Sequence, residues 1–161
     1  LGAHPTVSTV LLGGEQQHDS RVLVGPMVEL CARQFIVDRL FIGTDGFTPS
    51  LGFTARDYMR ATAVRALASR AERVVVLTES EKLGRHGPVP LLDAHDVAAL
   101  WTDSAAPDAQ VDALTGAGVE VVTVAADGAA VVHPAQARPE PDRVVGGDSA
   151  PTALTAREEP S

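Results

Sequence analysis

Cysteine and lysine each occur only once in this chain of 161 residues. Cys31 has no second cysteine to pair with, so no disulfide can form within the chain. Its place in an apolar helical pattern predicts a buried structural thiol rather than a reactive one. Lys82 stands beside twelve arginines. A single lysine in a chain that otherwise uses arginine suggests a need for a compact, mobile ammonium, for example to contact a phosphate. A surface lysine without a function is an equally good interpretation.

Basic clusters, long apolar runs and a signal peptide are also missing. The net charge is −8 and the isoelectric point is about 5.0. Proteins that bind nucleic acid need a basic face to replace the counterions around phosphates, so we expect no DNA binding by this chain alone. No apolar run approaches the roughly 20 residues of a membrane helix. We therefore expect a cytoplasmic protein that has no contact with a membrane.

The motifs of nucleotide and metal chemistry are absent as well. The sequence contains no Walker motif, no Gly-x-Ser-x-Gly elbow and no dinucleotide fingerprint. The five histidines show no paired metal-ligand spacing and have no cysteine partners. We expect neither a cofactor nor a metal site.

Apolar segments of strand length alternate with helical patterns through most of the chain. Hydrophobic residues make up 45% of the sequence, which is enough to fill a core. The pattern predicts strands at residues 7–12, 21–24, 40–43, 74–77, 97–101 and 119–124. It predicts helices from residue 26, over 55–71 and over 108–115. This alternation indicates an α/β fold, a mainly parallel sheet with helices on both faces.

Two further boundaries follow from local signals. Thr54, with Asp57 at the third position, predicts a capping box at the start of the second helix. We expect residues 1–133 to form one domain. Residues 134–161 combine prolines with charges and offer little to bury, which predicts a disordered tail.

Three of the expected strands end with the same chemistry. Each is followed by a threonine, an acid and a small residue: Thr44-Asp45-Gly46, Thr78-Glu79-Ser80 and Thr102-Asp103-Ser104. Ligands of open α/β sheets bind beyond the carboxyl ends of the strands, and Lys82 lies close to the second of these ends. A polar ligand site and a set of ordinary loop and cap residues are about equally good interpretations. Gly13-Gly14 could likewise bring N–H groups to a phosphate, although a plain turn is the commoner use.

Taken in order, several short motifs resemble the effector domain of DeoR/GlpR-type transcription regulators. The resemblance covers about residues 5 to 125. It is carried by Leu11-Leu12-Gly13-Gly14, Leu23-Val24-Gly25-Pro26, Phe41-Ile42-Gly43-Thr44-Asp45-Gly46, Glu79-Ser80-Glu81-Lys82-Leu83-Gly84, Leu100-Trp101-Thr102-Asp103 and Gly118-Val119-Glu120-Val121. Each motif is weak by itself, and the ordered set is specific.

The resemblance implies a fold shared with ribose-5-phosphate isomerase and glucosamine-6-phosphate deaminase, and a sensor for a phosphorylated sugar or polyol. Asp45, Gly46 and Lys82 match the family's site motifs, and Gly13, Gly14, Gly52 and Thr54 are expected as their neighbours. DNA would be bound only through a helix-turn-helix domain outside this chain. We also expect a homo-oligomer.

Two departures from the family pattern accompany the resemblance. Family members carry a helix-turn-helix, a strand and a Gly/Ser/Thr-rich phosphate loop before the point where Leu1 stands, so we expect the fold to be incomplete at its amino end. The helix after Thr54 usually bears a glutamate where this chain reads Ala61-Thr62-Ala63.

Two other functions remain open at this point. One is a sugar-phosphate isomerase or deaminase, which needs a positioned base. Asp45-Gly46 is followed by Phe47-Thr48-Pro49 rather than by further acids, so we do not expect an enzyme. The other is an inactive remnant that serves only for oligomerisation.

Overall fold

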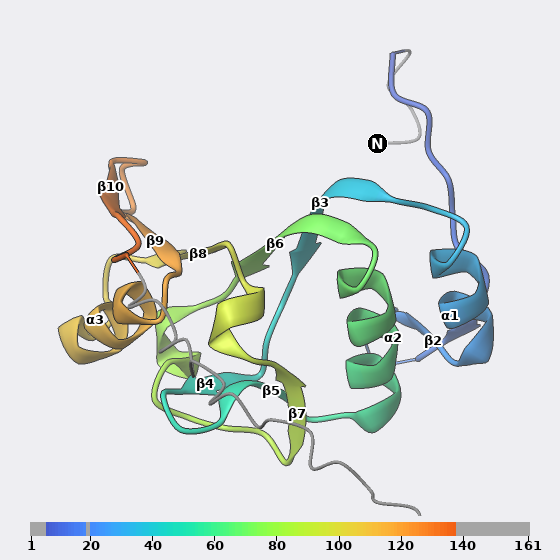
Figure 1. The fold of residues 1–161 in the computed structure, drawn as a ribbon, viewed down its shortest axis with the longest axis horizontal. Helices are drawn as coiled ribbons and strands as arrows, with labels where there is room; N and C mark the ends of the chain where they lie inside the picture. The colour runs from blue at the N-terminus through green and yellow to red at the C-terminus, as the bar shows by residue number, and fades with distance from the viewer. Residues whose placement is uncertain (1–5, 19, 138–161) are drawn as a thin grey trace, which may run out of the picture.

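The centre of the molecule is a five-stranded sheet in the order β10-β9-β8-β6-β3. A computed structural model describes residues 6–18 and 20–137 (Figure 1). The strands are β3 (Val37–Ile42), β6 (Ala71–Leu77), β8 (Ala99–Asp103), β9 (Glu120–Val124) and β10 (Ala130–His133). The first four run parallel to one another, and β10 pairs antiparallel with β9. The prediction of a mainly parallel α/β sheet is therefore confirmed.

Parallel neighbours need a crossover, and each crossover here carries different elements. The segment between β3 and β6 contains β4 (Gly46–Thr48), β5 (Gly52–Ala55) and helix α2 (Tyr58–Ala68). The segment between β6 and β8 contains the 3-10 turn η1, strand β7 and the 3-10 turn η2. Their bounds are Ser80–Lys82, Val89–Leu92 and Ala94–Asp96. Helix α3 (Asp108–Gly116) joins β8 to β9, close to its predicted bounds.

A second sheet of three short strands, in the order β4-β5-β7, packs beside the first and was not predicted. All of its pairings are antiparallel. Phe47 on β4 and Phe53 on β5 are fully buried, with their ring centroids 4.9 Å apart. The two rings fill the space between the sheets and so hold the loops at the end of β3 against the body of the domain.

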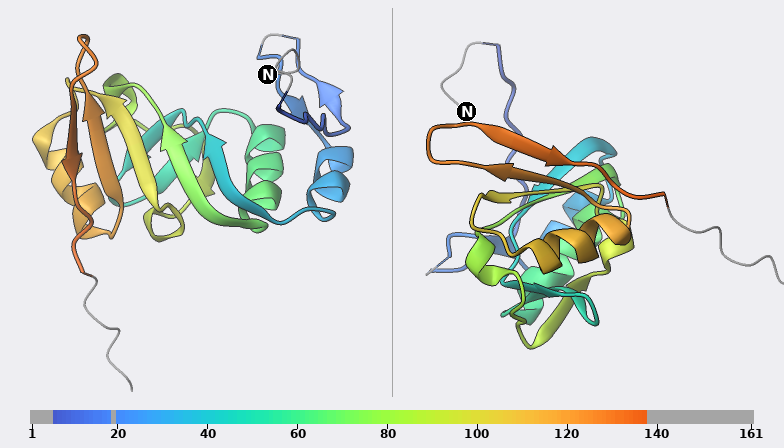
Figure 2. Two further views of the ribbon diagram at one scale, coloured as in Figure 1. Left: turned by 90° about the horizontal axis from the view of Figure 1, so that it is seen from above. Right: turned by 90° about the vertical axis from the view of Figure 1, so that its left-hand side faces the viewer.

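The core lies on one face of the large sheet. Figure 2 shows α3 and the small sheet gathered under that face, while the other face of the large sheet stands open. The fully buried core side chains include Phe53, Val76, Leu100, Leu114, Val119 and Val121. Burial of these apolar side chains is the main stabilising contribution that the composition can provide.

The prediction that helices cover both faces is wrong for the described residues. Leu77 and Trp101 are register partners on β6 and β8 and are 48% and 47% exposed. Phe41 on β3 and Val132 on β10 share this face and are also exposed. Arg39, Arg73 and Glu120 lie at the amino end of the same face, so its apolar part is confined to the carboxyl half.

The amino-terminal part differs from its prediction. Residues 7–12 form no strand; a hairpin of β1 (Glu15–Gln16) and β2 (Leu23–Val24) follows them. Helix α1 (Pro26–Ala32) begins with proline at its first position, as predicted. Several large apolar side chains are exposed here: Val10, Leu11, Met27, Leu30, Phe35 and Ile36.

Two boundaries need correction, and one prediction lies outside the described residues. Thr54 belongs to strand β5 and does not cap a helix; Asp57 is the N-cap of α2. The 119–124 segment is not the last strand, because β10 returns beside it. Residues 134–137 form neither helix nor strand, and the remainder of the predicted tail, 138–161, is not described.

The asymmetry of the sheet gives a test with two leucines. Leu100→Ala removes a fully buried side chain of the central strand and should lower the free energy of unfolding by about 2–5 kcal/mol. Leu77→Ala makes the same chemical change on the open face and should cost no more than about 1 kcal/mol. Urea denaturation of both variants measures the difference. Equal losses would contradict an open face.

Candidate functional site

The loops that follow β3, β6 and β8 lie at one edge of the large sheet. These strands are parallel neighbours, and their carboxyl ends carry Asp45, the η1 turn with Lys82, and Asp103. The predicted common edge for the three threonine–acid ends is confirmed. In open α/β sheets this is the edge at which ligands bind.

Asp45 presents a carboxylate at this edge that the backbone orients. Its Oδ2 accepts a hydrogen bond from the N–H of Arg56 at 2.8 Å. Its own N–H donates to the carbonyl of Thr54 at 3.0 Å. The side chain is 19% exposed. Oδ2 is therefore held by the chain, while Oδ1 accepts no hydrogen bond from the described residues and is available to a ligand.

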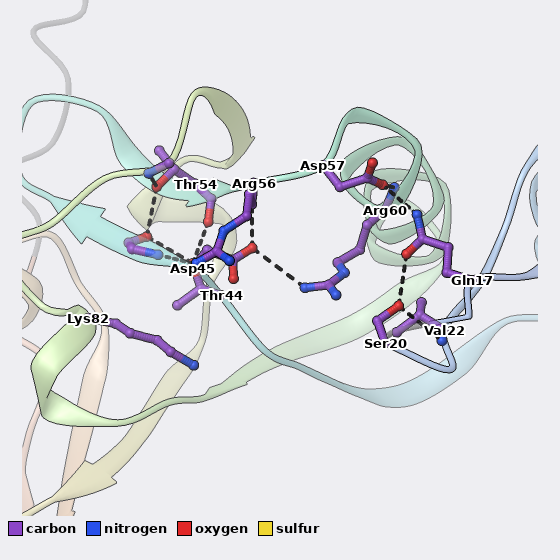
Figure 3. A network of polar contacts seen from close by, with 12 residues as sticks. Gln17, Ser20, Val22, Thr44, Asp45, Thr54, Arg56, Asp57, Arg60 and Lys82 are labelled. Carbon is purple, nitrogen blue, oxygen red and sulfur yellow. Dashed lines mark hydrogen bonds and ion pairs between the residues drawn. The ribbon is translucent and has the colours of Figure 1, made fainter.

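Arg60 is a charged neighbour of Asp45 that the sequence reasoning missed. Its Nη1 lies 3.5 Å from Asp45 Oδ2, and its side chain is 30% exposed. It reaches the carboxylate from the first turn of α2 (Figure 3). Correct placement of the helix start would have been the signal, because the N-cap at Asp57 puts Arg60 in the first turn.

The start of α2 is anchored by Asp57. Asp57 Oδ1 accepts hydrogen bonds from the N–H of Arg60 at 2.8 Å and from Gln17 Nε2 at 3.0 Å. These bonds, the Arg60 N–H first, hold the pKa of Asp57 below its ordinary value. The cap thus ties the amino-terminal hairpin to the helix that carries Arg60.

Lys82 ends the η1 turn and is half-buried. Its Nζ lies 3.8 Å from the carboxylate of Glu79, which is 76% exposed, so this pair is loose and screened by solvent. The next residues run beside β4, where the Gly84 N–H donates to the Phe47 carbonyl at 2.8 Å. Figure 3 shows the ammonium pointing out beside the Asp45 loop.

Gly46, Gly52 and Thr54 make contacts within the chain. Thr54 is buried; its hydroxyl donates to the Gly46 carbonyl at 3.2 Å and accepts from the Gly87 N–H at 2.8 Å. A side chain at Gly46 would run into the Arg85 carbonyl, and Gly52 has a φ of +68°, which favours glycine. Gly46 and Thr54 thus position the Asp45 loop, whereas Gly52 lies against Leu92 and Asp93 and lines a separate pocket with His95 and Gly116.

Gly13 and Gly14 lie beside helix α1. Gly13 faces Cys31 and Met27, and Gly14 passes close to Val28. No hydrogen bond in the described part of the chain joins either glycine to Asp45 or Lys82. The structure therefore does not bring these two glycines together with the other predicted site residues.

Asp103 connects two of the loops. Its carboxylate accepts the Ser80 N–H and the Ser80 hydroxyl, each at 2.7 Å, and the Ala105 N–H at 3.1 Å. The bonds from Ser80, its backbone N–H first, hold the pKa of Asp103 below its ordinary value. Of the three acids at this edge, Asp103 thus acts as a structural acceptor that positions the turn bearing Lys82.

The segment Ala61-Thr62-Ala63, where the family pattern has a glutamate, places no acidic side chain near the site. Ala61 and Ala63 are buried, and the Thr62 hydroxyl donates to the Tyr58 carbonyl at 2.9 Å. Among the described residues, Asp45 therefore forms the ion pair with Arg60, and Glu79 forms the ion pair with Lys82.

Concave surfaces lie at the opposite, amino edge of the sheet. A cavity of about 590 Å³ there is lined by residues that include Arg65, Ser69, Arg73 and Asp96. Nearby, the ligand atoms of Asp93, His95 and Asp96 lie within 4.8 Å of one another, a cluster that the histidine spacing did not predict. All three are exposed, and nothing further points to an ion.

Comparison with known proteins decides the family. The model of the DeoR C-terminal sensor domain matches residues 1–104. The chain belongs to this family. The expected family resemblance is confirmed, and with it a sensor domain of a transcription regulator.

Several curated proteins are similar to this sensor domain. A protein of Escherichia coli O157:H7 named for repression of the aga operon is 27% identical over 118 residues, which are 73% of this chain and 44% of the relative. The HTH-type transcriptional regulator GlpR of Haloferax volcanii is 28% identical over 112 residues, 70% of this chain and 44% of GlpR. The chain therefore spans less than half the length of these relatives.

None of the helices in residues 6–18 and 20–137 has the length and apolar character of a membrane span; the longest, α2, has 11 residues.

The contacts of Asp103 predict a pH dependence of stability. Because its pKa is lower in the folded chain, ionised Asp103 stabilises the fold fully above the unfolded value of about 4, and this contribution is lost as the pH falls through the folded value. Asp103→Asn should lower the unfolding temperature clearly at pH 7 and much less at pH 3. Asp38→Asn, an exposed acid on β3, is the matched control and should change little at either pH. A gap that is the same at both pH values would refute the role given to Asp103.

Proposed function

We propose that this sensor domain binds a phosphorylated sugar or polyol at the carboxyl edge of its sheet. Binding there controls DNA binding by a helix-turn-helix domain outside this chain. The observation that carries the proposal is that the loops bearing Asp45 and Lys82 follow two neighbouring parallel strands and are joined by the hydrogen bond from the Gly84 N–H to the Phe47 carbonyl. Asp45 Oδ1 would accept hydrogen bonds from hydroxyls, and Lys82 would bind the phosphate.

Regulation requires that the ligand bind one conformation better than another. A coupling free energy of about 1–3 kcal/mol is typical of such systems. The site is formed by loops and by the first turn of α2, and the Gln17–Asp57 hydrogen bond joins that turn to the amino-terminal hairpin. A ligand that shifts Arg60 or Asp45 would therefore act on the part of the chain that precedes the sheet.

An isomerase or deaminase activity is the second candidate, and the site offers it little support. A proton shuttle needs a base beside the substrate carbon. The residues after Asp45 and Gly46 are the buried Phe47 and then Thr48, so no second carboxylate follows in the loop. The named relatives are transcription regulators. We expect no turnover of sugar phosphates.

A remnant that serves only for oligomerisation is the third candidate. Its support is the open apolar face that contains Leu77 and Trp101. An isomerase assay and a thermal-shift series with sugar phosphates separate the three: turnover indicates an enzyme, a shift without turnover a sensor, and neither result a remnant.

Replacement of Lys82 tests the site directly. Lys82→Ala should weaken the binding of a sugar monophosphate by about tenfold to a hundredfold, because a charge-assisted hydrogen bond contributes about 1.5–3 kcal/mol. The fold should be unchanged, since Lys82 forms only a loose pair with Glu79. Isothermal titration calorimetry of the wild type and the variant measures the ratio.

Arg73→Ala is the control for this measurement. Arg73 is an exposed cation beside the cavity at the amino edge of the sheet, and its loss should leave the affinity unchanged. Equal affinities of the wild type and the Lys82→Ala variant would remove Lys82 from the site.

A further inference from the structure

The ion pair between Arg60 and Asp45 leaves both partners with unused capacity. Its 3.5 Å separation is longer than the roughly 2.7–2.9 Å of a strong charge-assisted hydrogen bond. Asp45 Oδ2 is already committed to the Arg56 N–H at 2.8 Å. The guanidinium is therefore not locked on the carboxylate and could turn toward a stronger anion with little loss.

Most of the donors of Arg60 have no acceptor in the described chain. A guanidinium carries five N–H donors in a planar fork. Nη1 faces Asp45, and Nε is buried with no hydrogen-bond partner among the described residues. An unsatisfied buried donor costs free energy, so a turn of the guanidinium that gives Nε an acceptor would be favoured.

Arg60 and Lys82 flank Asp45 from different elements. Arg60 comes from α2 and Lys82 from the η1 turn; Figure 3 shows Arg60 reaching Asp45 and the Lys82 side chain running past the Asp45 loop. Asp45 balances one of these two positive charges. Glu79 is 3.8 Å from Lys82 and largely in solvent, so it screens the second charge only weakly. The site therefore presents two cationic side chains, from two different elements, beside the Asp45 carboxylate.

We propose that Arg60 is a second anion-binding residue, so that the site takes a sugar or polyol with an anionic group at each end. Such a ligand is a bisphosphate or a phosphorylated sugar acid. Lys82 binds one end, the fork of Arg60 binds the other, and Asp45 Oδ1 accepts hydroxyls between them. This inference rests on the proposed function and narrows its ligand class.

The chemistry of the arginine supports a terminal phosphate or carboxylate on its side of the site. A guanidinium binds either group through two parallel hydrogen bonds, which a neutral hydroxyl cannot match. The helix position also favours an anion, because Arg60 stands in the first turn of α2, at the positive end of the helix dipole. When a ligand with one anionic group binds at Lys82, the Arg60 guanidinium stays paired with Asp45 and adds nothing to the binding free energy.

Calorimetric titration of the whole chain with three probes tests the inference. Fructose 6-phosphate carries one anionic group, fructose 1,6-bisphosphate carries two phosphates, and 6-phosphogluconate carries a phosphate and a carboxylate. We expect at least one doubly anionic probe to bind about tenfold to a hundredfold more tightly than the monophosphate, the gain of one charge-assisted contact. Which of the two is preferred distinguishes a bisphosphate ligand from a sugar acid.

Arg60→Gln should abolish this preference: the ratio of the affinity for the doubly anionic probe to the affinity for fructose 6-phosphate should fall to about one, because the second anion contact is lost. Arg56→Gln is the matched control, because Arg56 contributes its backbone N–H to Asp45 and that bond survives the substitution. It should retain the preference. Arg60→Lys keeps the charge without the fork and should retain a reduced preference, which preserves the test if the glutamine variant does not fold.

Two kinds of result would overturn the inference; one leaves the proposed sugar-phosphate site standing, and the other removes it. If the wild type binds all three probes equally, or if Arg60→Gln weakens all three alike, Arg60 only supports Asp45 and the proposed sensor function stands. If none of the probes binds, the proposed sugar-phosphate site itself fails, and the second anion contact fails with it.

Discussion

The buried hydroxyl of Thr54 holds together the three segments on which the site depends. It donates to the carbonyl of Gly46, after β3, and accepts the N–H of Gly87, in the loop that follows Lys82. The Thr44 hydroxyl lies 2.8 Å from the carbonyls of Gly46 and Thr54 and closes the network. A buried network with its partners satisfied rigidifies the chain around it. The loops of Asp45 and Lys82 are positioned by this network before any ligand arrives.

The polar side chains at this edge fall into two groups: those that hold the loops in place and those that keep hydrogen-bonding capacity for a ligand. The carboxylates of Asp103 and Asp57 accept hydrogen bonds from backbone N–H groups. They position the η1 turn and the start of α2, respectively. Asp45, Arg60 and Lys82 keep part of their hydrogen-bonding capacity and share one side of the sheet edge. A site assembled in this way changes specificity through the second group of residues while the first preserves the fold.

The large sheet could be predicted from the sequence because each of its parallel strands is an apolar run between helical patterns. The small sheet could not, since β4 and β5 have three or four residues each and show no periodicity. The repeated Gly-Phe-Thr around Pro49-Ser50 was nevertheless a signal for that hairpin, and Asp127-Gly128 was one for β10. Asp45 and Lys82 could be predicted because they follow strand ends. Arg60 could not, because the sequence pattern placed the helix start at Thr54, whereas the N-cap is Asp57.

Helix α2 has its first turn at the ligand edge and its last turn at the other edge of the domain. Eleven residues at 1.5 Å each make a rod of roughly 16 Å. The small, buried Ala61 and Ala63 let the helix pack closely against its neighbours. Arg65, Ala68 and Ser69, in its last turn, line the cavity of about 590 Å³. A single rigid element of the fold therefore connects the loop edge where Arg60 meets Asp45 to the cavity at the amino edge of the sheet.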